Sequence, residues 1–331
     1  MKKIAIIGKE DVDSLAWHIE YTLEKMNFNA KIFEPSGGVE KKFLNKNIQF
    51  YLTKLSTKYE ESTYHRLVRQ VVEYKADLII VILRSIPPYV IEKLKEELEI
   101  KIIFWTGDAF INLERGYALV SNYDAWFVKD TYMERFMKDK LNLNVYLIPE
   151  CCNPDFHRPP KNIKFASQHE VVIAGTLYPY RAKILEQLLE KFQIEIYGAL
   201  PKWMNKKWKE VHTGKYILLE EKSKVFYSSK INLNTLHYGE VDAGNCRLFE
   251  VAGSGGFQIC DRKEEIANYF EENKEIVCFD TIDELIEKIE YYLKHQDEAE
   301  IIANNAHKRA LNEHTYEHRI NTIFDIISFD R

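Results

Sequence analysis

The stretch EVVIAGTLYPYR, residues 170–181, decides the fold, because it repeats a pattern that already opens the chain as KIAIIGKED, residues 3–11. In both places a short run of apolar and β-branched residues ends at a glycine, Gly175 or Gly8, and a longer amphipathic stretch follows. An apolar run without polar alternation is typical of a strand that is buried on both faces of a parallel sheet. Two such beginnings predict two α/β domains.

The N-terminal half continues this alternation of strands and helices. Helical stretches begin at Asp13, which we expect to be an N-cap, near residue 56 and at Pro87-Pro88. The predicted strands lie at residues 3–7, 30–33, 77–83, 100–105 and 125–128. Strands that are separated by helices belong to a doubly wound parallel sheet with helices on both faces.

A proline-rich segment marks the predicted domain boundary. Pro149, Pro154, Pro159 and Pro160 are four of the nine prolines in the chain, and a polar stretch follows them. We therefore expect a Rossmann-like domain over residues 1–155, rejoined by a C-terminal helix over 316–331, and a second one over 163–315. The second domain is predicted to have strands at 170–174, 194–197, 230–234 and 257–260, and helices at 181–192, after Thr281, at 298–312 and at 316–328. The expected fold class is two doubly wound α/β domains facing a cleft.

Composition excludes several classes of protein. The 331 residues carry a net charge of −5, so no overall field draws the chain to nucleic acid. Five cysteines without a C-x-x-C pair argue against a disulfide framework and a zinc site, and they favour a reducing, cytoplasmic location. The apolar runs are shorter than the ~18 residues that a membrane helix needs, and the first one is too short for a signal peptide.

Two short stretches are rich in lysine, and one of them allows two interpretations. Residues 202–209, KWMNKKWK, interleave tryptophans with lysines, which is also typical of a surface that touches membranes or nucleic acid. We favour packing of Met204 and Trp208 on one helical face, with the lysines solvated, and retain peripheral membrane contact as the alternative. Residues 41–46 are predicted to form a small charged loop.

In parallel α/β sheets, ligands bind where strands end and helices begin. Gly175 and Thr176 follow one predicted strand and Gly198 follows the next, so the backbone there can approach a ligand closely. Arg181 can add a bidentate hydrogen-bonded contact to a phosphate group. The spacing is typical of a diphosphate site, although it also fits a tight connection between a strand and a helix.

A second loop gathers polar groups of three kinds. The segment 232–256, NLNTLHYGEVDAGNCRLFEVAGSGG, runs from a strand through a glycine-bearing loop into a short helix. Arg247 can neutralise a phosphate, and Glu250 can accept two hydrogen bonds from the paired hydroxyls of a ribose or sugar. The same two residues, three apart on a helix, could instead form a surface ion pair.

These residues carry a resemblance to a known family. The stretch NCRLFEVAGSGG at 245–256, followed by Phe279-Asp280, by residues 283–285 and by NEHTYEHR at 312–319, resembles the C-terminal half of the CgeB-like, spore-maturation-type glycosyltransferases of the GT-B fold. The likeness covers residues 170–320 well. The N-terminal half, with Trp105-Thr-Gly107-Asp108, looks like the more variable acceptor domain of that family.

The resemblance implies transfer of a sugar from a nucleotide-diphosphate donor, with a UDP-sugar favoured, to a cell-surface, protein or small-molecule acceptor. It implies that Asp242 lies near the transferred sugar, that Glu250 holds the ribose, and that Gly198 and residues 227–230 receive the base. The residues that it places around the donor are Gly175, Thr176, Arg181, Gly198, Gly244, Asn245, Arg247 and Glu250. Asp242 departs from the glutamate of the family pattern, and Glu240 is its rival.

The catalytic step leaves alternatives open. A base for the acceptor hydroxyl could be Asp108, Asp11 or His237, and a retaining enzyme needs none. Two arginines can stabilise the leaving diphosphate, so we expect neither a metal nor a cofactor, and we interpret Asp11-Val-Asp13 as a helix start instead of a metal motif. The alternatives are a nucleotide-sugar epimerase or hydrolase on the same fold, and a non-catalytic nucleotide-sugar-binding coat or assembly protein.

Overall fold

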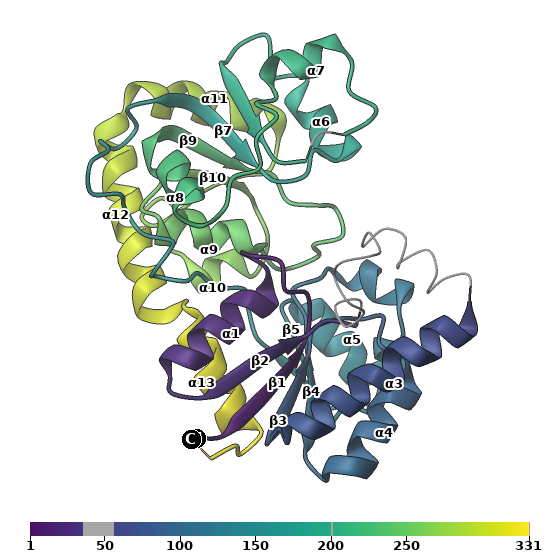
Figure 1. Ribbon diagram of the computed structural model, residues 1–331. Helices are drawn as coiled ribbons and strands as arrows, with labels where there is room; N and C mark the ends of the chain where they lie inside the picture. Colours follow the sequence, from purple (N-terminus) through teal and green to yellow (C-terminus); the bar gives the residue numbers. More distant parts are fainter. Residues whose placement is uncertain (36–55, 200, 331) are drawn as a thin grey trace. The chain divides into compact units, whose positions relative to one another are not determined.

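A computed structural model describes residues 1–35, 56–199 and 201–330, and the charged loop predicted at 41–46 lies outside these ranges. The chain forms two compact units (Figure 1). The N-terminal unit comprises residues 1–129, 133–148 and 320–331, and the C-terminal unit comprises residues 130–132 and 149–319. The division thus falls at Ile148, before the predicted boundary segment 155–163.

The N-terminal unit contains a parallel sheet of six strands in the order β2-β1-β3-β4-β5-β6. Its elements are β1 (Lys3–Ile7), α1 (Leu15–Lys25), β2 (Asn29–Phe33), α3 (Thr57–Tyr74), β3 (Leu78–Val81), α4 (Pro88–Leu98), β4 (Lys101–Trp105), the 3-10 helices η1 (Phe110–Arg115) and η2 (Ala118–Val120), β5 (Ala125–Val128), α5 (Thr131–Leu141) and β6 (Val145–Leu147). Ile4 to Ile7 are all fully buried, as expected for a strand with both faces covered.

The C-terminal unit contains a second parallel sheet, in the order β11-β10-β9-β7-β8. Its elements are β7 (His169–Ala174), α6 (Pro179–Leu185), β8 (Ile194–Tyr197), α7 (Lys206–Val211), α8 (Leu219–Ser228), β9 (Ser229–Asn234), α9 (Cys246–Gly253), β10 (Gln258–Asp261), α10 (Ile266–Tyr269), β11 (Val277–Phe279), α11 (Ile282–Lys294), α12 (Gln296–Glu313) and the start of α13 (Tyr316–Ile326). Val171 and Ile173 pack into one core cluster and Val172 into another, which explains the uninterrupted apolar run. The fold class predicted from the sequence, two doubly wound α/β domains, is confirmed.

The chain ends in the N-terminal unit. Residues from Ile320 onward group with that unit, where the rings of Phe28 and Phe324 lie 5.2 Å apart. Cys152, by contrast, exchanges backbone hydrogen bonds with His314 and Tyr316 in the C-terminal unit. These bonds hold the connecting segment after Pro149 on the C-terminal side of the division.

Several predicted details differ from the structure. Asp13 is not the N-cap of α1: its φ is +67°, its carboxylate lies 2.9 Å from Nε2 of His18, and Ser14 accepts the capping bond from Trp17 instead. The helix predicted over 181–192 begins at Pro179 and ends at Leu185. The strands β6 and β11 and the helix α8 were not predicted, because the two strands are only three residues long and α8 carries charges among its apolar positions.

The tryptophan-lysine stretch packs as favoured, with a different geometry. Met204 and Trp208 are buried in the core of the C-terminal unit, whereas Trp203 is exposed. Helix α7 begins only at Lys206, after its N-cap Asn205, so Met204 precedes the helix instead of sharing one of its faces. None of the helices in the described ranges combines the length and the apolar character that a membrane span requires.

Candidate donor site at the strand ends of the C-terminal unit

The neighbouring strands β9, β7 and β8 bring three loops together at their carboxyl ends. Gly175 and Gly198 end β7 and β8 with φ values of +139° and +142°, where a side chain is strained. A Cβ atom on Gly198 would lie 2.5 Å from the carbonyl oxygen of Gly175. Gly198 is therefore needed for the close approach of the two backbones, and Gly175 is favoured by its own positive φ.

Arg181 fastens the loop after β7 to the loop after β9. Its Nε donates to Oγ1 of Thr235 at 2.8 Å, Nη2 to the carbonyl of Thr235 at 2.6 Å, and Nη1 to the carbonyl of Thr176 at 2.7 Å. The residue is only 8% exposed. Because a guanidinium has five N–H donors, two remain for a ligand after these three bonds.

Arg247 approaches the same strand ends from α9. Its Nε donates to the carbonyl of Ala174, the last residue of β7, at 3.0 Å. Arg181 and Arg247 line one small cavity, and burial together with the charge of Arg247 lowers the pKa of Arg181 to about 10. Two guanidinium groups that repel each other in this way favour an anion between them.

Glu250 is the acidic partner of this pair, and it is not a surface residue. The residue is 5% exposed, and its carboxylate accepts from Nη1 of Arg247 through Oε2 and from Nζ of Lys222 at 2.8 Å through Oε1. Lys222 lies on α8 and is 1% exposed. The predicted i,i+3 ion pair therefore exists, but it is part of a buried triad.

Asn245 and Gly244 serve the start of α9. Asn245 is the N-cap, since its Oδ1 accepts from the backbone N–H of Leu248, and its amide exchanges two hydrogen bonds with Asn234 at 3.0 and 3.1 Å. A Cβ on Gly244 would lie 2.7 Å from Leu248. Both residues thus hold the helix start against the end of β9. The other predicted donor residue, Thr176, lies exposed in the loop after β7.

Asp242 belongs to a different cluster, together with Asp130 and Glu265. Asp130 Oδ2 accepts from the backbone N–H groups of Asp242 and Ala243, both at 3.1 Å, and Thr131 donates from its hydroxyl to Asp242 and from its backbone to Glu265. Each of the three carboxylates thus accepts at least one hydrogen bond from a neighbouring segment. We therefore assign the three carboxylates to a clasp that holds the loop before α9.

The candidate bases lie in different surroundings. His237 follows β9, and its Nδ1 accepts from the backbone N–H of Gly239 at 3.0 Å. Asp108 belongs to the N-terminal unit, where its carboxylate is ion-paired with Arg84, while Asp11 lies exposed in the loop after β1. The segment 227–230 precedes or begins β9, so it lies at the opposite end of the strand from Gly198, and the implied base contact there disagrees with the topology.

The sequence did not single out Lys222, Thr235, Asp130 or Asp261. Each gave a signal: Lys222 precedes Val225 and Phe226 by three and four residues on the apolar face of a helix, and the other three lie at or just after the end of a strand. Asp261 ends β10 and accepts from the backbone N–H of Leu236, and burial raises the pKa of its carboxyl to about 6.

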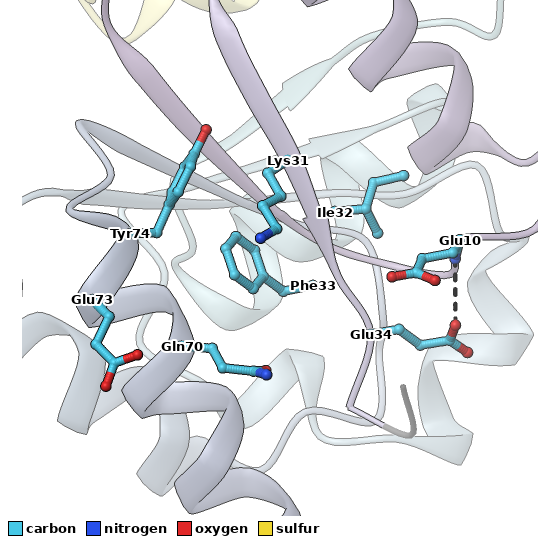
Figure 2. Close-up of a pocket in the computed structure, with 8 residues that line it drawn as sticks. All are labelled: Glu10, Lys31, Ile32, Phe33, Glu34, Gln70, Glu73 and Tyr74. Atoms are coloured by element: carbon cyan, nitrogen blue, oxygen red, sulfur yellow. Dashed lines mark hydrogen bonds between the residues drawn. The ribbon is translucent and has the colours of Figure 1, made fainter. Parts of the chain in front are cut away.

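A larger pocket, of about 400 Å³, lies in the N-terminal unit between β2 and α3 (Figure 2). Among the described residues, three carboxylates line it, Glu10, Glu34 and Glu73, together with one cation, Lys31. Figure 2 shows Glu10 and Glu34 beside each other, with the backbone N–H of Glu10 3.5 Å from the carboxylate of Glu34. An acidic lining of this kind repels a diphosphate, so we keep the strand ends of the C-terminal unit as the candidate site.

Solved structures with this fold are known. Sucrose-phosphate synthase from Thermosynechococcus elongatus is 12% identical with a TM-score of 0.72, over 99% of this chain and 98% of that one. HepE from Anabaena, solved in complex with UDP-glucose, is 12% identical with a TM-score of 0.66, over 99% and 100%. The lipopolysaccharide outer core galactosyltransferase WaaB is 15% identical with a TM-score of 0.63, over 98% and 99%. These likenesses concern the fold.

Comparisons of the sequence alone give one match, to a family model. No curated protein matches the chain at a significant level. Residues 181–325 match the model of a family described as glycosyl transferase-like, and this range includes Arg181, Arg247 and Glu250. The C-terminal part of the chain is therefore similar to glycosyl transferase-like proteins, and the chain has the two-sheet fold of the GT-B glycosyltransferases.

Proposed function

We propose that this protein transfers a sugar from a nucleoside-diphosphate sugar, with UDP as the favoured nucleotide, to a cell-surface, protein or small-molecule acceptor. The observation that carries the proposal is the convergence of Arg181 and Arg247 on the ends of β7 and β9, with Glu250 beside them. The UDP-glucose complex of the structurally similar HepE and the glycosyl transferase-like match support it.

The chemistry of each group fits this reaction. Cleavage of a glycosyl–phosphate bond builds negative charge on the leaving diphosphate, and buried guanidinium groups stabilise that charge. Arg181 keeps two N–H donors for it, and the partly exposed Arg247 keeps three. Glu250 has used one position on each oxygen, so each retains acceptor capacity for a ribose hydroxyl.

We further propose that the chain is a CgeB-like hexosyltransferase of the cytoplasm. The motif at residues 245–256 and the terminal stretch 312–319 support the subfamily. All five cysteines are free thiols and four of them are buried, which supports a reducing compartment.

Turnover of the donor tests the proposal. Release of UDP from UDP-glucose by the full chain should increase when a mixture of glycoside and protein acceptors is added, and the sugar should appear on an acceptor. Release at the same rate without any acceptor, with free glucose as the product, would identify a hydrolase instead. Binding of UDP-glucose with no turnover under either condition would favour the non-catalytic alternative.

We propose that the reaction needs no metal, because the two arginines supply the charge that a divalent cation would otherwise provide. Treatment with EDTA followed by desalting should leave the rate of UDP release within about twofold of the untreated protein. A loss of activity that Mg²⁺ or Mn²⁺ restores would contradict this part of the proposal.

A further inference from the structure

Four aromatic rings gather beside the candidate donor site. Tyr178 and Tyr180 come from the loop and helix start after β7, and His237 and Tyr238 come from the loop after β9. The rings of Tyr178 and His237 lie 5.0 Å apart, those of Tyr180 and Tyr238 lie 5.9 Å apart, and His237 packs on Tyr238 at 4.1 Å. We call these four residues the aromatic platform.

The platform is exposed although it is aromatic. Tyr178, Tyr180 and Tyr238 are 44%, 42% and 63% exposed, and within the described part of the chain no residue forms a hydrogen bond with any of their three phenol groups. Exposed apolar surface that is clustered and rimmed by polar groups marks a binding site more often than scattered residues do. Tyr180 directly precedes Arg181, so the platform adjoins the arginine that ties the two loops together.

The geometry suits a sugar ring better than a nucleobase. A base stacks best between parallel ring faces, but the two ring pairs that bridge the loops are inclined by 72° and 74°. Because of these inclinations, the aromatic platform presents both ring faces and ring edges to a ligand. A pyranose offers C–H groups on its face and hydroxyls at its rim, which matches aromatic surfaces edged by phenol groups.

We propose that the aromatic platform binds a pyranose ring, through stacking on Tyr238 and Tyr180 and through hydrogen bonds from the phenol groups. The ring belongs either to the sugar of the donor or to an acceptor saccharide, since both offer the same chemistry. This inference rests on the proposed function, because it takes the adjoining arginines as the diphosphate site.

The test compares Tyr238→Ala and Tyr180→Ala with the control variant Tyr291→Ala in the intact chain. Tyr291 lies on α11, is 43% exposed and stacks on His295 at 3.9 Å, so it reproduces an exposed tyrosine–histidine pair away from the strand ends. The probes are UDP and UDP-glucose by titration calorimetry, and methyl α-glucoside in the presence of UDP by saturation-transfer NMR. Unchanged far-UV spectra and melting temperatures identify the variants that are folded.

A donor-side platform predicts that UDP-glucose binds about 5–10-fold more weakly to the platform variants while UDP binding is unchanged, a loss typical of one aromatic contact. An acceptor-side platform predicts unchanged binding of both nucleotides and loss of the glucoside signal. The control should match the wild type in both cases. Equal weakening of UDP and UDP-glucose, or no change with any probe, would overturn the proposal, whereas wild-type protein that binds neither nucleotide would overturn the proposed function instead.

Discussion

At the residue scale, the burial of Glu250 and its two ion pairs distinguish this residue from an ordinary surface charge. Its position three residues after Arg247 is compatible with both interpretations, and only packing decides between them, because Lys222 arrives from a helix 28 residues earlier in the chain. Local spacing predicted the pair with Arg247, since neighbours on one helix turn follow from helix geometry. It could not predict Lys222, which depends on how α8 packs against the sheet.

The first prediction concerns this buried triad. Glu250→Gln leaves the ammonium of Lys222 buried beside a neutral amide, so we expect a loss of about 3–5 kcal/mol of unfolding free energy, as for a broken buried ion pair. The variant should also lose the rise in melting temperature that UDP gives to the wild type. Denaturant unfolding and thermal shift measure the two effects.

The matched control is the double variant Glu250→Gln/Lys222→Met. It removes both charges, so it should recover most of the unfolding free energy while the UDP effect stays absent. A double variant that binds UDP as tightly as the wild type would show that Glu250 does not hold the ribose.

At the element scale, the ends of strands carry most of the candidate site. The sequence placed Gly175, Gly198 and Arg181 there correctly, because an apolar run that stops at a glycine marks a strand end in almost any context. Its assignment of Asp242 to the donor sugar stays a prediction, and the structure adds that the carboxylate and the backbone of Asp242 are bound in the clasp with Thr131 and Asp130. That clasp joins residues 111 or more apart in the chain, which no local pattern can indicate.

The second prediction tests the clasp. Asp130→Ala removes the acceptor of two backbone N–H groups at residues 242 and 243, and we expect the loop before α9 to loosen and the Kd for UDP-glucose to rise about 10-fold, equivalent to one or two lost hydrogen bonds. Asp130→Asn keeps one carbonyl oxygen, so its Kd for UDP-glucose should lie between those of the wild type and Asp130→Ala. Calorimetric titration of the donor measures the effect.

Asp139→Ala on the exposed side of α5 serves as the control and should bind like the wild type. Unchanged donor affinity in Asp130→Ala, with a lowered melting temperature, would show that the clasp supports stability alone.

At the scale of the whole molecule, each unit repeats one rule: a buried parallel strand, a connection at its carboxyl end and a covering helix. The repeat made the fold class predictable, because the apolar pattern of Lys3–Ile7 and of His169–Ala174 can be recognised in the sequence without knowing which residues are in contact. The exact division of the chain was less accessible, since it depends on bonds such as those of Cys152 with His314 and Tyr316.

The third prediction concerns the acid stability of the C-terminal unit. His314 is buried among aromatic rings, donates from Nε2 to the carbonyl of Tyr269 and accepts from Arg319 at Nδ1, and burial with the charge of Arg319 lowers its pKa to about 4. Because the folded pKa lies below the ordinary value near 6.5, the stabilisation is present above pH 6.5 and is lost as the pH falls toward 4.

We expect the unfolding free energy to decrease by up to about 3 kcal/mol over this interval from His314 alone. Denaturant unfolding at pH 7, 6, 5 and 4 should show this slope, and His314→Gln, which cannot gain a proton, should show a shallower one. Equal slopes in the two proteins would contradict the assignment.

The most direct test of the account is binding of nucleoside diphosphates at the ends of β7 and β9. The melting temperature of the wild type should rise with UDP, or with one of GDP, dTDP and CDP, and the rise should be absent in Arg247→Met and in Arg181→Met. Arg262→Met, which removes an arginine paired with Glu272 and Asp280 at the end of β10, should respond like the wild type. If none of the four nucleotides shifts the wild type, or if the two site variants respond as strongly as it does, the assigned donor site is wrong.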